Sequence, residues 1–153
     1  MNTEELYLKT VFSCMACDGS IADEEIQVLG NYVKGTPYFG NIDSQEVINR
    51  FVRDINIQGS SFLKNYLREL SDAHLDENGE LTIIKLSLET IKADNHIDYS
   101  EVSFFKKIRS RLDVSDETIL KNVEVEDLFL NQDIIDDEEV EFMPSFSEIS
   151  ITA

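Results

Sequence analysis

The sequence has little that would interrupt helices. It holds 2 prolines and 6 glycines in 153 residues and no tryptophan, and no uninterrupted apolar run approaches the length of a membrane span. Apolar residues recur instead every three or four positions. Helices should therefore dominate, and a chain of this length fits one domain. We expect no segment that inserts into a membrane.

Basic residues are also scarce. There are 13 of them against 31 acidic residues, for a formal net charge of −18. Such a field repels nucleic acid and anionic lipid and attracts cations and basic protein surfaces, so nucleic acid is excluded as a partner. The opening residues, Met1 to Glu5, are acidic where a signal peptide would be basic. We therefore expect a cytoplasmic protein.

Residues that carry redox, zinc or catalytic chemistry are sparse. Cys14 and Cys17 have Cys-x-x-Cys spacing, but no βαβ pattern surrounds them, and the two histidines, His74 and His96, lack zinc-finger spacing. We interpret the cysteines as small core residues. The signatures of zinc proteases, serine hydrolases, phosphate-binding loops and dinucleotide-binding loops are all missing. The chain is predicted not to be an enzyme.

Capping signals and apolar spacing predict an all-α, single-domain bundle of about seven helices over residues 1–130. The predicted helices are Asn2–Cys17, Asp23–Lys34, one capped by Asp43 and running through Ile55, one from Ser60 or Ser61 through Leu70, Gly79–Ala93, one capped by Asp98 and running through Leu112, and a short one capped by Ser115. The segment 79–93 is apolar nearly all round, so we expect it to lie at the centre.

Residues 131–153 differ in kind from the helical body. They carry seven acidic residues and no lysine or arginine, which is typical of a solvated acidic C-terminal tail. They also contain Phe142, Met143, Phe146, Ile149 and Ile151. These apolar residues leave two further interpretations open: a docking segment, or a segment that folds back on the domain.

One motif, Asp-x-x-Ile-x-x-x-Glu, occurs twice, 76 residues apart. Asp18, Ile21 and Glu25 of the first copy correspond to Asp94, Ile97 and Glu101 of the second, and the flanking apolar positions correspond as well. Each copy should form a helix, a tight turn and a second helix. We therefore expect two helical hairpins related by a pseudo-twofold axis.

The two aspartates are the least easily explained part of the motif. Each follows the negative end of a helix, which costs about 0.3–1 kcal/mol, whereas the glutamates fall at the third position of the next helix, where capping explains them. Either the next helix's N–H groups offset the cost, or a cation does. The predicted metal ligands are Asp18, Glu25, Asp94 and Glu101. The EF-hand pattern fails, because its twelfth position counted from Asp94 is Phe105.

The first copy, Ala16-Cys17-Asp18-Gly19-Ser20-Ile21-Ala22-Asp23-Glu24-Glu25, resembles the turn of the TerB family of tellurite-resistance proteins. A similar helical domain occurs in a membrane-anchored DnaJ-like co-chaperone, and the resemblance covers roughly residues 5–120. It implies a bacterial, non-enzymatic seven-helix bundle that acts in resistance to tellurite and other stresses. It also implies that the acidic residues bind divalent cations. The second copy departs from the pattern, because Asn95 replaces the glycine and no alanine precedes its aspartate by two residues.

Two functions from different classes follow. The first is a divalent-cation-binding scaffold or sensor that holds calcium or another cation weakly and has protein partners in a stress-resistance complex, with membrane association of that complex left open. The alternative is an acidic protein-interaction module that docks a basic partner without metal. A carboxylate-metal hydrolase is the least favoured outlier.

Overall fold

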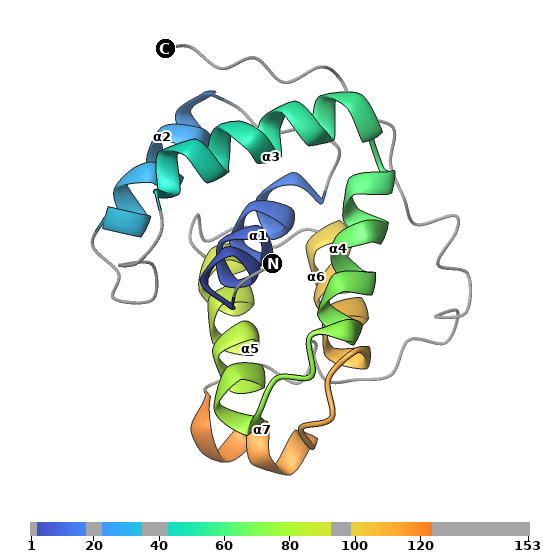
Figure 1. Ribbon diagram of the computed structural model, residues 1–153. Helices are drawn as coiled ribbons and strands as arrows, with labels where there is room; N and C mark the ends of the chain where they lie inside the picture. Colours follow the sequence, from blue (N-terminus) through green and yellow to red (C-terminus); the bar gives the residue numbers. More distant parts are fainter. Residues whose placement is uncertain (1–2, 18–22, 35–42, 93–98, 124–153) are drawn as a thin grey trace.

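The computed structural model describes residues 3–17, 23–34, 43–92 and 99–123, and the side chains of residues 23–25 lie outside that description. These ranges contain seven helices and no strand, which confirms the predicted all-α bundle (Figure 1). The helices are α1 (Thr3–Ala16), α2 (Asp23–Lys34), α3 (Ser44–Gln58), α4 (Ser61–Asp72), α5 (Glu77–Lys92), α6 (Tyr99–Ser110) and α7 (Asp116–Asn122). None of them is both long and apolar enough to cross a lipid bilayer.

Side-chain caps determine where several helices begin. The Asp43 carboxylate accepts a hydrogen bond from the Glu46 N–H at 3.3 Å, and the Ser115 hydroxyl accepts one from the Thr118 N–H at 3.2 Å, as predicted. Helix α5 begins two residues before the predicted Gly79. The reason is a cap that the pattern did not indicate, since the Asp76 carboxylate accepts from the Gly79 N–H at 2.7 Å. The predicted cap Asp98 lies outside the described residues.

A glycine separates α3 from α4. Gly59 has a φ of +59°, a left-handed backbone that other residues adopt only at a cost, and its N–H donates to the Ile55 carbonyl at 2.8 Å. Its conformation ends α3 and lets the chain turn sharply into α4 at a corner of the bundle (Figure 1).

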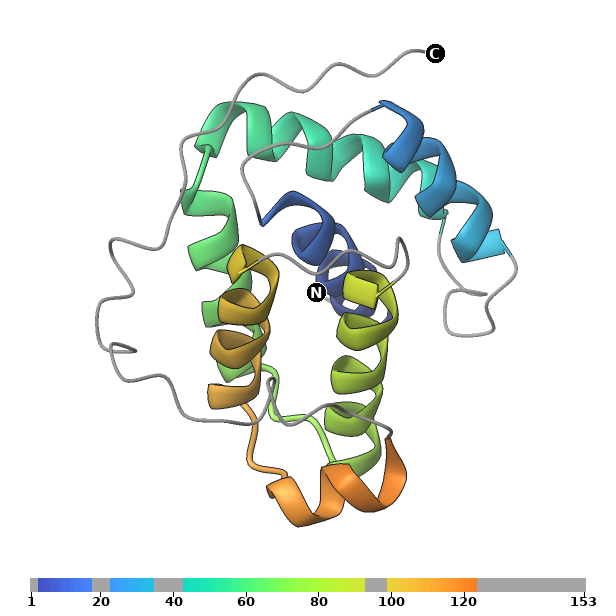
Figure 2. The ribbon, with the colours of Figure 1, turned by 180° about the vertical axis from the view of Figure 1, so that it is seen from behind.

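Helix α1 is the central helix. It contacts α2, α3, α4, α5 and α6, with α5 as its most extensive neighbour. Figures 1 and 2 show it enclosed from both sides, with α3 crossing one end of the bundle and α7 closing the other. The prediction that residues 79–93 occupy the centre is therefore wrong: α5 packs against α1, α6 and α7, and Leu81 is only half-buried.

The error has a physical cause. Polar residues on α1 made its apolar stripe look narrow, yet Lys9, Thr10 and Ser13 are all buried, at 6%, 0% and 0% exposure. Hydropathy counts such residues as surface residues. Their burial costs free energy unless partners replace the water that they lose, as happens for Lys9 and Thr10.

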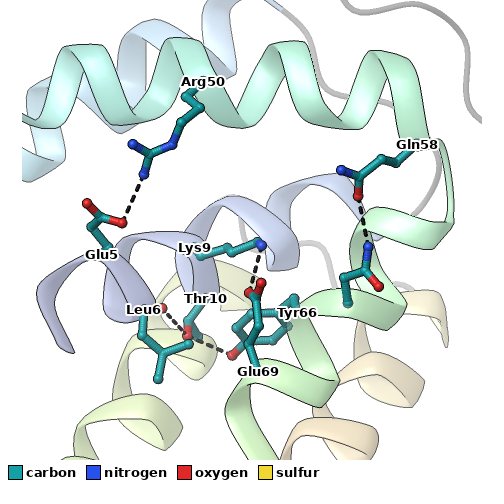
Figure 3. A network of polar contacts seen from close by, with 9 residues as sticks. Glu5, Leu6, Lys9, Thr10, Arg50, Gln58, Tyr66 and Glu69 are labelled. Carbon is teal, nitrogen blue, oxygen red and sulfur yellow. Dashed lines mark hydrogen bonds and ion pairs between the residues drawn. The ribbon is translucent and has the colours of Figure 1, made fainter. Parts of the chain in front are cut away.

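Thr10 and Tyr66 join α1 to α4 through hydroxyl groups (Figure 3). The Thr10 hydroxyl donates to the Leu6 carbonyl at 2.8 Å and lies 2.6 Å from the Tyr66 hydroxyl. Because the single Thr10 proton is used on Leu6, Tyr66 must be the donor in the second bond. Burial raises the pKa of Tyr66 well above its ordinary value, which keeps that proton in place.

Lys9 joins the same two helices through charge. Its Nζ lies 2.7 Å from a Glu69 carboxylate oxygen (Figure 3). The same Nζ lies 4.6 Å from the centre of the Phe62 ring, within cation–π range. The Phe62 ring packs in turn on Phe12 and Phe51, with ring centroids 5.5 and 6.0 Å away. The ammonium group is thus seated between a carboxylate and the aromatic core.

The helix bounds repeat with the predicted spacing. Helix α5 ends 76 residues after α1 ends, and α6 begins and ends 76 residues after α2 does. The doubled sequence pattern therefore produces doubled helix–turn–helix boundaries. The pseudo-twofold relation between the hairpins stays a prediction.

Replacing Ser13 by alanine should stabilise the protein. The Ser13 hydroxyl oxygen is buried and has no hydrogen-bond partner within the described residues, so its removal relieves an unmet desolvation cost. We expect the free energy of unfolding in urea to rise by about 1 kcal/mol. The matched control is Ser87→Ala, because the Ser87 hydroxyl donates to the Ile83 carbonyl at 2.8 Å and its loss should give no gain. A loss of stability in Ser13→Ala would contradict this account.

The Lys9–Glu69 pair should respond asymmetrically to mutation. Glu69→Gln leaves a buried ammonium without its counter-charge and should cost about 1–2 kcal/mol, since Glu69 is partly exposed. Lys9→Met fills the same space without charge and should change stability by less than about 1 kcal/mol. Urea unfolding measures both. The control is Glu117→Gln, whose pair with Lys121 is exposed, and equal costs for the three variants would refute the asymmetry.

Candidate functional site

The structure describes the predicted metal-ligating residues only in part. Glu25 and Glu101 occupy the third positions of α2 and α6, as the motif predicts. Glu101 is half-buried, whereas the side chain of Glu25 lies outside the described part. Asp18 and Asp94 also lie outside the described residues, as do the turn residues Gly19, Ile21, Asn95 and Ile97.

The end of α1 meets the beginning of α6. The Cys17 thiol donates to the Cys14 carbonyl at 3.2 Å and lies 3.9 Å from the Ser100 carbonyl oxygen, in the first turn of α6. Cys17 is the residue before the first motif, and Ser100 immediately precedes the glutamate of the second. The structure therefore brings the start of one motif copy against the end of the other, a contact that the repeat alone did not predict.

Cys14 lies close to this junction and is chemically quiet. Burial is the main cause that raises the pKa of its thiol to about 12. A hydrogen bond with Ser87 opposes the rise, and the negative charge of Glu101 adds to it. Both cysteines are free thiols with 1% exposure. The interpretation of Cys14 and Cys17 as core residues is confirmed, since both side chains belong to the buried hydrophobic cluster.

Glu80 is a buried carboxylate that sequence analysis did not single out. It is 7% exposed and accepts hydrogen bonds from the Val114 N–H at 2.8 Å and from the Asp113 N–H at 2.9 Å. These bonds fix the connection between α6 and α7 against the first turn of α5. The available signal was an acidic residue inside the most apolar predicted segment, and the structure gives it a structural role.

The basic residues on α6 also find structural roles. Arg109 donates through Nε to the Asp116 carboxylate at 2.7 Å, which ties α6 to α7. This contact gives Arg109 a structural role.

The described residues do not compose a metal site by themselves. Among them, no group of three or more His, Cys, Asp or Glu side chains is placed to hold a metal ion. Calcium takes 6–8 oxygen ligands, and Glu101 is the one predicted ligand whose side chain is described. A cation site at these turns thus depends on Asp18 and Asp94.

Comparisons with family models, with curated proteins and with solved structures find no match to this chain. The resemblance to the TerB family therefore rests on the motif residues alone and stays a prediction.

The ionisation of Cys14 should make stability depend on pH in the alkaline range. The thiol has an ordinary pKa of 9.0 when unfolded and about 12 when folded, so above pH 9 the unfolded chain releases a proton that the folded chain keeps. Stability from this group is full below pH 9 and is lost as pH rises toward 12, at about 1.4 kcal/mol per pH unit.

The measurement is urea unfolding of the wild type and Cys14→Ala between pH 8 and pH 10.5. The variant should be less stable at pH 8 because of the cavity it leaves, yet its stability should fall less steeply above pH 9. Parallel pH profiles for the two proteins would show that Cys14 does not titrate in this way.

Proposed function

We propose that this chain is a cytoplasmic, non-catalytic binding domain whose two Asp-x-x-Ile-x-x-x-Glu turns respond to a divalent cation in a bacterial stress-resistance system. The observation that carries the proposal is the junction of α1 with α6, where Cys17 contacts the Ser100 carbonyl at 3.9 Å. Asp18 follows Cys17 directly in the chain, and Glu101 follows Ser100. The contact supports a shared neighbourhood for acidic residues of both copies.

Acidic residues of both motif copies are needed at one cation, because a single turn supplies too few oxygen ligands. An Asp and a Glu from one copy fall well short of the six or more oxygens that calcium prefers. Donors from two copies, together with backbone carbonyls such as that of Ser100, come closer to the required number. The expected affinity is weak, and the ion would act by relieving repulsion between the carboxylates.

Binding of the cation would stabilise the folded chain at the junction of α1 with α6. A ligand that binds only the folded chain stabilises it in proportion to its concentration over its dissociation constant. Here the ion would link the end of α1, the central helix, to the beginning of α6. Partners in the stress-resistance complex would then recognise a bundle whose rigidity depends on the ion.

Calorimetric titration with calcium, magnesium, manganese and zinc tests the proposal. Wild-type protein should release or absorb heat with at least one of these ions, and the Asp18→Asn, Asp94→Asn double variant should lose that heat. The matched control is Asp72→Asn, Asp113→Asn, which removes equal charge from two exposed positions on the bundle. No wild-type heat, or equal heat in both double variants, would reject cation binding at the turns.

The alternative of an acidic interaction module is favoured by the distribution of charge. Residues 124–153 contain ten acidic residues and no basic one, while the described ranges contain 18 acidic and 13 basic residues. Most of the net negative charge of the chain therefore lies in one continuous stretch, residues 124–153. Capture of a basic partner that is sensitive to salt, indifferent to metal and lost on deletion of residues 131–153 would favour this function over the first.

A further inference from the structure

The positive charges of the chain lie entirely within the described helical ranges. All 13 lysine and arginine residues fall there, against 18 acidic residues, whereas the rest of the chain holds 13 acidic residues and no basic one. Residues 1–123 hold all 13 basic residues against 21 acidic ones, so the positive charge of the chain is confined to the helical part of the sequence.

Two neighbouring helices carry much of the positive charge. Residues 61–72 and 99–111, which cover α4, α6 and the residue after it, contain six basic residues and three acidic ones. The basic residues are Lys64, Arg68, Lys106, Lys107, Arg109 and Arg111, and the acidic ones are Glu69, Asp72 and Glu101. Glu69 already pairs with Lys9, and Arg109 already pairs with Asp116. The positive charge is therefore in excess on this side of the bundle.

Helices α4 and α6 pack directly against each other. The rings of Tyr66 and Phe104 lie 6.1 Å apart, and Figures 1 and 2 show the two helices side by side, both running toward the end of the bundle where α7 lies. Exposed charges on α4 and on α6 therefore lie on adjacent helices.

The basic residues lie on both helices. Lys64 and Arg68 are four residues apart on α4, so they share one side of that helix. Lys107 lies near the end of α6, and Arg111 is the residue after it. We name these four residues the basic face. Lys64, Arg68 and Arg111 are exposed and form no ion pair within the part of the chain that the structure describes.

The acidic segment 131–153 is able to reach this face. Described residues end at Val123, after α7; the Arg109–Asp116 contact holds the first residue of α7 beside α6, and α7 then runs toward α5 (Figure 1). The seven residues from 124 to 130 extend up to about 25 Å, and α4 is about 18 Å long. Distance therefore places no obstacle between the segment and any part of the basic face.

We propose that the acidic segment 131–153 docks on the basic face of its own chain. The segment has seven negative charges and no positive one, which complements the four cationic side chains. Individual surface ion pairs are weak, but a short tether holds the segment at an effective concentration in the millimolar range, so weak contacts suffice. A basic partner of the segment would then have to compete with Lys64, Arg68, Lys107 and Arg111, which makes the contact an internal inhibitor of partner binding.

Paramagnetic relaxation in the full chain tests the proposal. A nitroxide attached to Ser147→Cys broadens amide signals near the segment, while Cys14 and Cys17, both buried, stay unlabelled. At low ionic strength we expect loss of signal in residues 61–72 and 99–111. The signals should return in 0.5 M salt, where screening shortens the range of charge interactions to about 4 Å.

Charge reversal locates the contact. Lys64→Glu, Arg68→Glu should abolish the broadening, whereas the matched control Lys34→Glu, Lys85→Glu, which makes the same charge change at exposed positions on α2 and α5, should keep it. Should the first variant not fold, the salt dependence of the wild-type signals decides. Broadening absent at low salt, or centred on another face, overturns the proposal. If broadening appears only when spin-labelled and isotope-labelled molecules are mixed, the segment docks on a second copy of the chain. That result also overturns the proposal.

Discussion

The enclosure of α1 is the constraint on which the rest of the structure depends. A helix with five helical neighbours has almost no side that water reaches, so a polar side chain on it either bonds to protein or, like Ser13, goes without a partner among the described residues at a cost in stability. Thr10 does so with Tyr66, and Lys9 with Glu69. Both partners lie on α4, so α4 is held to α1 by directional bonds as well as by apolar packing. Such bonds favour one relative placement of the two helices, where apolar contact alone permits several.

The sequence correctly predicted helix bounds and caps that depend on residues close together in the chain. The bounds of α2 and the caps at Asp43 and Ser115 agree with the structure, because a cap is a contact between residues three apart and is visible in the pattern itself. The start of α5 was misplaced because Asp76 follows a stretch that reads as loop. The location of the central helix was missed because Lys9, Thr10 and Ser13 score as surface residues until their partners, 56 and 60 positions away for Thr10 and Lys9, are known.

The candidate site shows the same division between local and distant information. Placing Glu25 and Glu101 at the third residue of their helices needed only the motif spacing. The approach of Cys17 to Ser100 joins residues 83 positions apart, and a repeat states which segments are alike without stating which of them touch. Sequence similarity between the copies therefore predicted two equivalent turns but gave no sign that Cys17 approaches Ser100.

The buried cysteines have a consequence for how the bundle opens. Cys14 and Cys17 sit at the end of the central helix, beside α6, and neither is accessible while α1 and α6 remain packed. A thiol-modifying reagent or an oxidant would reach Cys17 only after α1 and α6 separate locally, and Cys14 only after α1 separates from α5 as well. The rate at which these thiols are modified therefore reports how often the end of α1 opens, in a protein that needs no added probe.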